Sequence, residues 1–148
     1  MKIISPLFLL LLAGMIPATL THSQNILTLE SPDKTIQLNI NTTDFLEVSV
    51  VIDSVVILDY SRLSMSVEDE QVLGLNPKIR KKHLDQADRL VEPVVSEKFA
   101  LIHEKYNELR LKFKGDYQVN FRAYNEGVAW QFETFYKDEI TVNREQLL

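Results

Sequence analysis

Apolar and polar residues alternate along most of the chain with a period of two, which is typical of strands that bury one face. The clearest example is residues 36–41 (IQLNIN), which follow the turn sequence Ser31-Pro32-Asp33. Residues 26–30 are expected to pair with them as a hairpin. Further strands are expected at residues 46–52, 55–58, 63–67, 90–95, 99–102, 109–113, 117–123 and 128–132, with a last apolar strand near residues 135–142.

Two segments depart from the alternation. Residues 55–58 (VVIL) form a short continuous apolar run, which predicts a strand buried on both faces. Residues 68–89 carry clusters of charge (EDE, KIRKK, DQADR) with few apolar positions, and we interpret them as a long surface loop that contains at most a short strand or a turn of helix. Pro93 cannot donate a hydrogen bond to a ladder, so residues 90–95 are predicted to form an edge strand.

Residues 116–134 (DYQVNFRAYNEGVAWQFET) predict an amphipathic hairpin. The reversal is expected at Asn125-Glu126-Gly127. The apolar face comprises Tyr117, Val119, Phe121 and Ala123 before the turn, and Val128, Trp130 and Phe132 after it.

About eight to ten strands follow from these patterns, and a single open sheet would leave its apolar face in water. The sequence therefore predicts an all-β fold, an antiparallel β-sandwich of two sheets. The sequence does not decide whether the second sheet has all its strands. A last strand near residues 135–142 is expected to present an unpaired edge. An immunoglobulin-like sandwich is equally compatible with the alternation.

Composition narrows the class of protein. A length of 148 residues suits one domain, and 45% hydrophobic with 25% charged residues is ordinary for a folded protein. The formal charge of -5 opposes binding to nucleic-acid phosphates. No cysteine is present, which excludes disulfides and thiolate metal sites.

The N-terminus resembles an export signal. Lys2 precedes the apolar run Leu7–Ile16, and small residues lie just before Gln24. Ten apolar residues are too few to span a bilayer, for which about 20 are needed, so no membrane anchor is expected. Residues 1–23 are predicted to be a cleaved signal peptide, and residues 24–148 a periplasmic or secreted domain.

Metal-binding patterns are weak. His83 and His103 have no second histidine or carboxylate at the spacing of a metal motif, so surface histidines are the simpler interpretation. Glu68-Asp69-Glu70 could attract a cation, but the glycine-punctuated spacing of a calcium loop is missing. A solvated acidic turn is the simpler interpretation here.

Candidate catalytic acids are also ordinary surface residues. A glycosidase needs two carboxyl groups about 5 to 10 Å apart, and Asp116, Glu126 and Glu133 could in principle supply them. Acids at turns and on solvent faces are common, so no catalytic residue is predicted. Trp130 and Tyr124 could stack on a sugar ring. Trp130 shares its face with Val128 and Phe132, which favours the core, whereas Tyr124 is the better candidate for carbohydrate contact.

Three stretches resemble the N-terminal domain of glycoside hydrolase family 97, a family of bacterial α-glucosidases and α-galactosidases. They are the opening Leu29-Glu30-Ser31-Pro32-Asp33, then Tyr106-Asn107-Glu108-Leu109, and then the run from Phe121 to Trp130 (FRAYNEGVAW). The likeness extends over about residues 26–136. Departures include Lys34 in place of the family's glycine and Ser96 in place of the glycine after the Pro93-Val94 pair.

The resemblance implies a galactose-mutarotase-like super-sandwich that packs against a catalytic (β/α)8 barrel. The family's calcium ion takes one glutamate from a later part of the N-terminal domain, beyond Leu148, so no cofactor or catalytic role is carried to residues of this chain. We therefore expect the non-catalytic front portion of an exported α-glycosidase acting on α-linked oligosaccharides, inactive without the barrel. The alternative is a stand-alone carbohydrate-binding or adhesion module that uses Tyr124.

Overall fold

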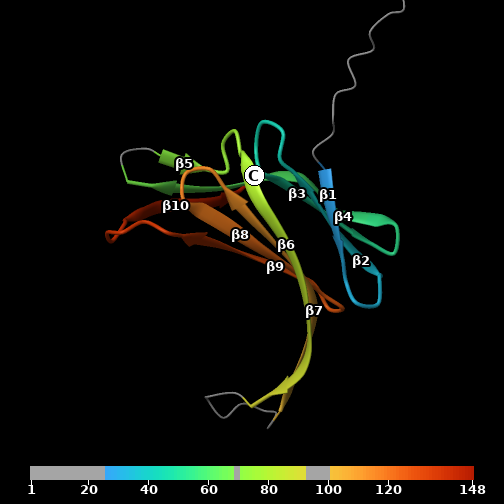
Figure 1. Cartoon of the computed structure of the whole chain (residues 1–148). Helices are drawn as coiled ribbons and strands as arrows, with labels where there is room; N and C mark the ends of the chain where they lie inside the picture. Colours follow the sequence, from blue (N-terminus) through green and yellow to red (C-terminus); the bar gives the residue numbers. More distant parts are fainter. Residues whose placement is uncertain (1–25, 69–70, 93–100) are drawn as a thin grey trace, which may run out of the picture.

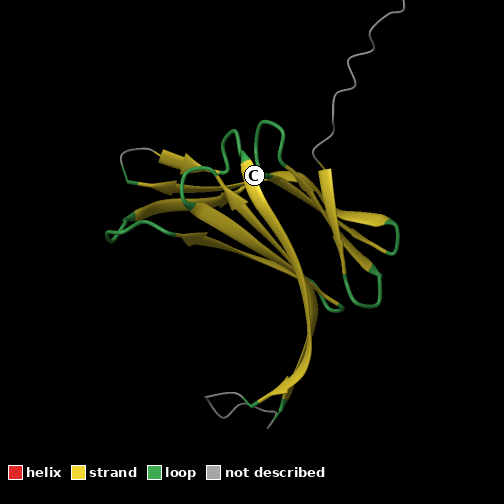
Figure 2. Ribbon diagram, viewed as in Figure 1, coloured by secondary structure: helices red, strands yellow, loops and turns green. Residues whose placement is uncertain are grey.

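The computed structural model describes residues 26–68, 71–92 and 101–148, and every regular element within them is a strand (Figure 2). No helix that could cross a membrane occurs in these three ranges. The predicted signal peptide and the positions of Pro93 and residues 94–100 lie outside them. The strands are β1 (Ile26–Glu30), β2 (Ile36–Asn41), β3 (Glu47–Ile52), β4 (Val55–Val67), β5 (Gln71–Leu73), β6 (Ile79–Val91), β7 (Ile102–Phe113), β8 (Tyr117–Tyr124), β9 (Val128–Thr134) and β10 (Val142–Leu147).

The strands form two antiparallel sheets that face each other (Figure 1). A six-stranded sheet has the order β1-β2-β3-β4-β10, with β5 also paired to β4. A four-stranded sheet has the order β6-β7-β8-β9. The predicted two-sheet β-sandwich is confirmed, and so is the hairpin of β1 with β2, whose register pairs Glu30 with Gln37.

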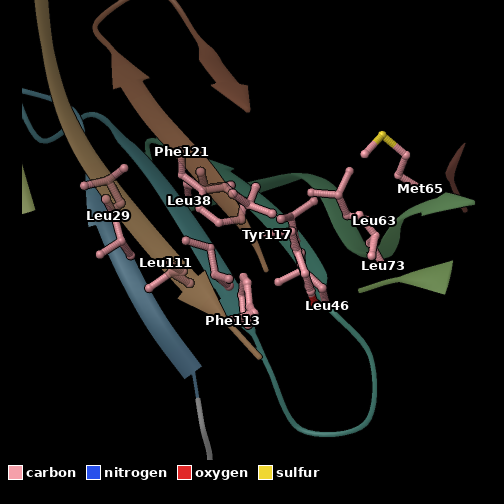
Figure 3. Packing of buried hydrophobic residues seen from close by; sticks show 14 of the residues in the cluster. Leu29, Leu38, Leu46, Leu63, Met65, Leu73, Leu111, Phe113, Tyr117 and Phe121 are labelled. Atoms are coloured by element: carbon pink, nitrogen blue, oxygen red, sulfur yellow. The ribbon is translucent and has the colours of Figure 1, made fainter. Parts of the chain in front are cut away.

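The core lies between the sheets, where alternate side chains of both meet in a single cluster (Figure 3). Leu38 from β2 and Phe121 from β8 are fully buried there. Full burial of a large apolar side chain contributes about 1.5–3 kcal/mol, so this cluster is the main source of stability. The Phe113 and Tyr117 rings stack with centroids 5.0 Å apart, and the Tyr117 hydroxyl accepts a hydrogen bond from the Gly74 N–H at 3.2 Å.

The predicted faces of the 116–134 hairpin are confirmed. The four apolar residues of β8 are all buried, and the three of β9 are half-buried and pack against the same core. Trp130 therefore takes the core position that its neighbours indicated. The reversal lies where it was expected, closed by a hydrogen bond from the Tyr124 N–H to the Gly127 carbonyl at 2.8 Å.

The surface loop predicted for residues 68–89 is wrong. The turn and short β5 occupy its first part, but β6 begins at Ile79 and pairs with β7 over its whole length. Most residues of β6 are exposed on both faces of the ribbon, so no apolar stripe exists to produce a period of two. Cross-strand ion pairs, such as Asp85 with Arg110 at 2.8 Å, take the place of apolar contacts.

The buried strand predicted for residues 55–58 is also wrong in its burial. These residues begin the long strand β4, and Val55, Val56 and Ile57 are about three-fifths exposed. The reason is positional: β4 leaves a two-residue turn at Asp53 and Ser54, both with positive φ, at the rim of the sandwich. An apolar run alone does not distinguish a core strand from a rim strand.

The last strand lies further along the chain than expected. Residues 135–141 form no strand but connect β9 of one sheet to β10 of the other. β10 pairs with β4 from Val142 opposite Val67 to Leu147 opposite Leu63. The final strand predicted near residues 135–142 thus lies at residues 142–147. It pairs with β4 on one side and is the last strand of the larger sheet, so within the described ranges its other edge is open, as expected.

Candidate functional site

The three stretches that carry the family likeness meet at one end of the sandwich. The Asn107 amide on β7 donates a hydrogen bond to the Glu30 carbonyl at the end of β1, at 2.8 Å. The Asn125 side-chain oxygen, in the β8–β9 turn, accepts one from the Asp33 N–H at 3.2 Å. These four residues, here named the inter-sheet clamp, connect the two sheets through polar contacts.

The turn between β1 and β2 is rigid because its side chains satisfy its backbone. One carboxylate oxygen of Asp33 accepts hydrogen bonds from the Ser31 hydroxyl at 2.6 Å and the Thr35 N–H at 3.1 Å. These bonds lower the pKa of Asp33 below its usual value, the bond from Ser31 having the largest effect. Ser31 itself is buried and accepts the Ile36 N–H, so the turn presents Asp33 to the clamp in a fixed position.

A charged cluster covers the outer face of the smaller sheet behind the clamp. Glu108 is buried and lies between Arg110 at 2.7 Å and Arg122 at 2.6 Å. The Arg122 guanidinium also lies 4.4 Å from the centre of the Tyr106 ring. Burial acts to lower the pKa of Arg122, but hydrogen bonds to Tyr124 and Glu108 outweigh it and raise that pKa. The cluster fixes the spacing of β7 and β8.

Tyr124 lies at the edge of this cluster. It is half-buried, and its ring is tilted by 57° against the Tyr106 ring at a centroid distance of 5.0 Å. The hollow beside it measures about 110 Å³, whereas sites for small ligands usually measure roughly 300–1,000 Å³. The carbohydrate contact predicted for Tyr124 therefore has no pocket of its own and stays a prediction.

The candidate acids lie in the turns and on the outer face of the smaller sheet. Asp116 and Glu126 lie in the turns at opposite ends of β8, which at about 3.3 Å per residue separates them by roughly 25 Å. Glu133 lies on the outer face of β9, where Gln118 donates to its carboxylate at 2.7 Å.

The histidines are surface residues, as the simpler interpretation predicted. His83 is half-exposed and 4.0 Å from Asp85, and His103 is half-exposed and 2.7 Å from Asp88. Among the residues that the structure describes, no group of three or more His, Asp or Glu residues could hold a metal ion. Glu68 accepts a hydrogen bond from the Thr141 N–H at 3.3 Å, while residues 69–70 lie outside the described ranges.

Two larger hollows flank the smaller sheet. One, of about 560 Å³, lies between β1 and β6 and is lined by Leu29, Leu84 and the clamp residue Asn107. The other, of about 600 Å³, lies beside the β2–β3 turn and is lined mainly by cations, among them Lys78, Lys82 and Lys114. Both are open hollows, suited to surface contact.

The β6–β7 ribbon continues past the other strands. β8 pairs with β7 only from Tyr106 to Lys112, so residues 88–91 and 102–105 form a two-stranded arm, visible as the projecting end of β6 and β7 in Figure 1. Ion pairs hold it together, including Arg89 with Glu104 at 2.7 Å. Leu90 on the arm is 65% exposed. The arm has no apolar core of its own.

The alternation of apolar residues did not predict the inter-sheet clamp, although the sequence of β7 contains one indication of it. Asn107 precedes Leu109, Leu111 and Phe113 at the same spacing of two, so it is a polar residue in register with the core face of β7. A polar residue at such a position needs a hydrogen-bond partner. The partner in this fold is the Glu30 carbonyl.

Comparison with known proteins gives a consistent result. Residues 29–147 match the family described as Glycosyl-hydrolase 97 N-terminal. A retaining alpha-galactosidase from Bacteroides thetaiotaomicron is 32% identical over 111 residues, which cover 75% of this chain and 17% of that protein.

Solved structures share the fold. A glycoside hydrolase family 97 enzyme from Pseudoalteromonas sp. strain K8, in complex with acarbose, has a TM-score of 0.69 at 20% identity, covering 82% of this chain and 20% of the other. A beta-arabinopyranosidase has a TM-score of 0.71 at 22% identity, with the same coverage. The chain thus spans about a fifth of the length of these relatives.

Proposed function

The chain belongs to the glycosyl-hydrolase 97 N-terminal family, and from this premise we propose that it is the non-catalytic β-sandwich portion of an exported α-glycosidase. In this role it packs against a catalytic (β/α)8 barrel and holds it in place. The reaction takes place on the barrel, with α-linked oligosaccharides as substrates.

The observation that carries this proposal is the arm formed by residues 88–91 and 102–105. An isolated two-stranded ribbon is marginally stable in water, and here the four-stranded sheet supports only its base. Leu90, at 65% exposure, and Ile102, at 39%, present apolar surface on this arm. Contact with a neighbouring domain would bury that surface and stabilise the ribbon.

The first experiment tests for activity of the chain by itself. The purified protein is incubated with aryl α-glucosides and aryl α-galactosides, and release of the aryl group is measured. We expect no turnover above buffer, because the proposed reaction takes place on the barrel, and Asp116 and Glu126 lie in turns at opposite ends of β8. Turnover that follows the protein through purification, and that disappears in Glu133→Gln, would overturn the proposal.

The second experiment tests the packing. The barrel portion of the Bacteroides thetaiotaomicron alpha-galactosidase, expressed without the segment that matches this chain, is mixed with the chain and analysed by sedimentation velocity and by its α-galactosidase activity. We expect a complex, and a gain in the activity or thermal stability of the barrel. A barrel that neither binds the chain nor responds to it would contradict the proposal.

A matched pair of variants locates the contact. Leu90→Asp places a charge on the arm and is expected to weaken the complex at least tenfold. Val72→Asp places the same charge on β5 of the other sheet, where the side chain is 41% exposed, and is expected to leave binding unchanged. Both positions are exposed, so both variants are expected to fold.

Export is tested separately from packing. With residues 1–23 attached, expression in a Gram-negative host is expected to yield a periplasmic protein whose N-terminus is Gln24. A protein that stays in the cytoplasm with Met1 in place would contradict the predicted signal peptide.

A further inference from the structure

The hollow beside the β2–β3 turn gathers positive charge on an acidic chain. Five cations line it, from the start of β6 and from the β7–β8 turn: Lys78, Arg80, Lys81, Lys82 and Lys114. The formal charge of the whole chain is -5, and no carboxylate is found among the described residues that line the hollow. The hollow is therefore a local region of positive potential, and such regions concentrate anions.

The backbone brings these cations together. Leu75 pairs with Phe45, which places the segment before β6 against the β2–β3 turn (Figure 1). The Lys114 N–H donates to the Lys78 carbonyl at 2.9 Å, so these two lysines are neighbours just beyond the paired ends of β6 and β7. The position of the cluster is thus set by the fold.

Most of this charge is not neutralised by the protein. Arg80 lies 3.9 Å from Asp116, with both side chains more than half exposed, and no ion pair joins the other four cations to a described carboxylate. Elsewhere on the same sheet the cations are closely paired, as Arg122 is with Glu108 at 2.6 Å. An anion in the hollow would relieve the repulsion among the unpaired lysines.

Protection of a sheet edge explains only part of the cluster. β6 is an edge strand of the smaller sheet, and lysine on an edge strand hinders pairing with further strands. Lys81 and Lys82 lie within β6 and fit that role. Lys78 and Lys114 lie outside the strands, where no ladder needs protection, so their place in the hollow points to a ligand.

The remaining lining residues favour a sugar over a nucleic acid. The Thr43 hydroxyl donates its proton to the Asn41 side-chain oxygen at 2.8 Å, so it can only accept a hydrogen bond from a ligand. Sugar hydroxyls can donate that bond. Among the described residues no aromatic ring lines the hollow, so nucleic-acid bases would have nothing to stack on. The volume of about 600 Å³ lies within the roughly 300–1,000 Å³ of small-ligand sites.

We propose that this hollow binds an acidic oligosaccharide, a glycan segment that carries carboxylate or sulfate groups. Lys78, Lys82 and Lys114 hold the negative groups, and the Thr43 hydroxyl accepts a hydrogen bond from a sugar hydroxyl. The contacts are between exposed charges, so binding weakens as salt is added. This inference goes beyond the proposed function and does not depend on it, because the hollow lies on the sandwich itself and requires no barrel.

Calorimetric titration of the purified chain at low salt tests the site. One probe is a short heparin oligosaccharide, which carries sulfate and carboxylate groups, and another is an oligogalacturonate, which carries carboxylates alone. A maltooligosaccharide of equal length is the neutral control. We expect the acidic probes to bind and to be released as salt is raised, while the neutral sugar does not displace them. Binding of heparin alone would identify sulfate as the group that the lysines hold.

Two double variants of equal charge place the binding at the hollow. Lys82→Gln with Lys114→Gln removes two of the lining charges and is expected to weaken binding of the acidic probe about tenfold. Lys137→Gln with Arg144→Gln removes two charges from the β9–β10 connection and β10, and is expected to leave binding unchanged. All four side chains are exposed, so both variants are expected to fold, which circular dichroism checks.

Three results would overturn the proposal. One is that neither acidic probe binds at low salt. Another is that both double variants weaken binding equally, which would mean that total charge and not the hollow attracts the probe. The third is that single-stranded DNA of the same charge competes as well as heparin, which would make the hollow a surface for polyanions in general.

Discussion

Removal of the Asn107 amide tests whether the inter-sheet clamp stabilises the sandwich. In Asn107→Ala the Glu30 carbonyl loses its donor at 2.8 Å. An unsatisfied buried carbonyl costs about 1–3 kcal/mol, and the site is half-buried, so we expect a loss at the lower end, about 1–1.5 kcal/mol. For a domain of this size that lowers the melting temperature by roughly 3–7 °C.

Asn107→Asp separates the hydrogen bond from the shape of the side chain. At pH 7 the introduced carboxylate faces the Glu30 carbonyl with no proton to donate, so this variant is expected to be less stable than Asn107→Ala. Once protonated, the carboxyl can donate, so its pKa in the folded state lies above the unfolded value of about 3.9. The stabilising form is therefore present below that value and is lost as the pH rises through the folded pKa.

Urea denaturation, followed by circular dichroism at pH 7 and pH 3.5, measures both effects. The control is Asn120→Ala, which removes a surface amide that donates to Glu133 at 3.2 Å within the smaller sheet, and we expect a change below about 0.5 kcal/mol. If Asn107→Ala unfolds at the same urea concentration as the original chain, or if Asn120→Ala costs as much, the clamp is not a source of stability.

Three further changes test other parts of the structure. Gly74→Ala is expected to lower the free energy of unfolding by more than about 1 kcal/mol, measured by thermal unfolding, because φ is +93° and the added Cβ would lie 2.4 Å from the Leu63 carbonyl oxygen. A variant as stable as the original chain would show that this position tolerates a Cβ. Asp33→Asn is expected to lose less stability on acidification than the original chain. The lowered pKa of Asp33 stabilises the fold above the usual value of 3.8, and this contribution is lost as the pH falls through the folded pKa. If variant and original lose stability equally on acidification, the ionised Asp33 does not stabilise the turn. Tyr124→Ala is expected to abolish any binding of maltooligosaccharides in calorimetric titration, and binding that persists would exclude Tyr124 as the sugar contact.

The alternation of apolar residues predicted those strands that have a face in the core. In β2, β8 and β9, every second residue packs against the opposite sheet, so burial itself creates the pattern. β6 was missed for the same reason: it belongs to a ribbon that is exposed on both faces, so its sequence carries no alternation of apolar and polar residues. Val55–Ile57 were placed in the core because an apolar run does not reveal whether a second sheet covers it.

The clamp and the arm could not be derived from the period alone. Both depend on contacts between residues far apart in the chain, such as Asn107 with Glu30, and cross-strand register cannot be read from one strand. The family likeness located the same stretches from their residues, and the structure supplies the physical reason for two of them: Asn107 and Asn125 are the polar contacts between the sheets.

The crossing from β9 to β10 has a consequence for the order of folding. β10 joins β4 although Val67 and Val142 are about 75 residues apart, and closing so long a loop is entropically costly and slow. During synthesis β1 to β4, which are neighbours in sequence and emerge first, can pair before β10 exists, so the edge of β4 that β10 covers stays open until the last residues emerge. A nascent chain halted before residue 142 would therefore expose the full length of that edge, and chaperone binding is expected to be strongest at this stage.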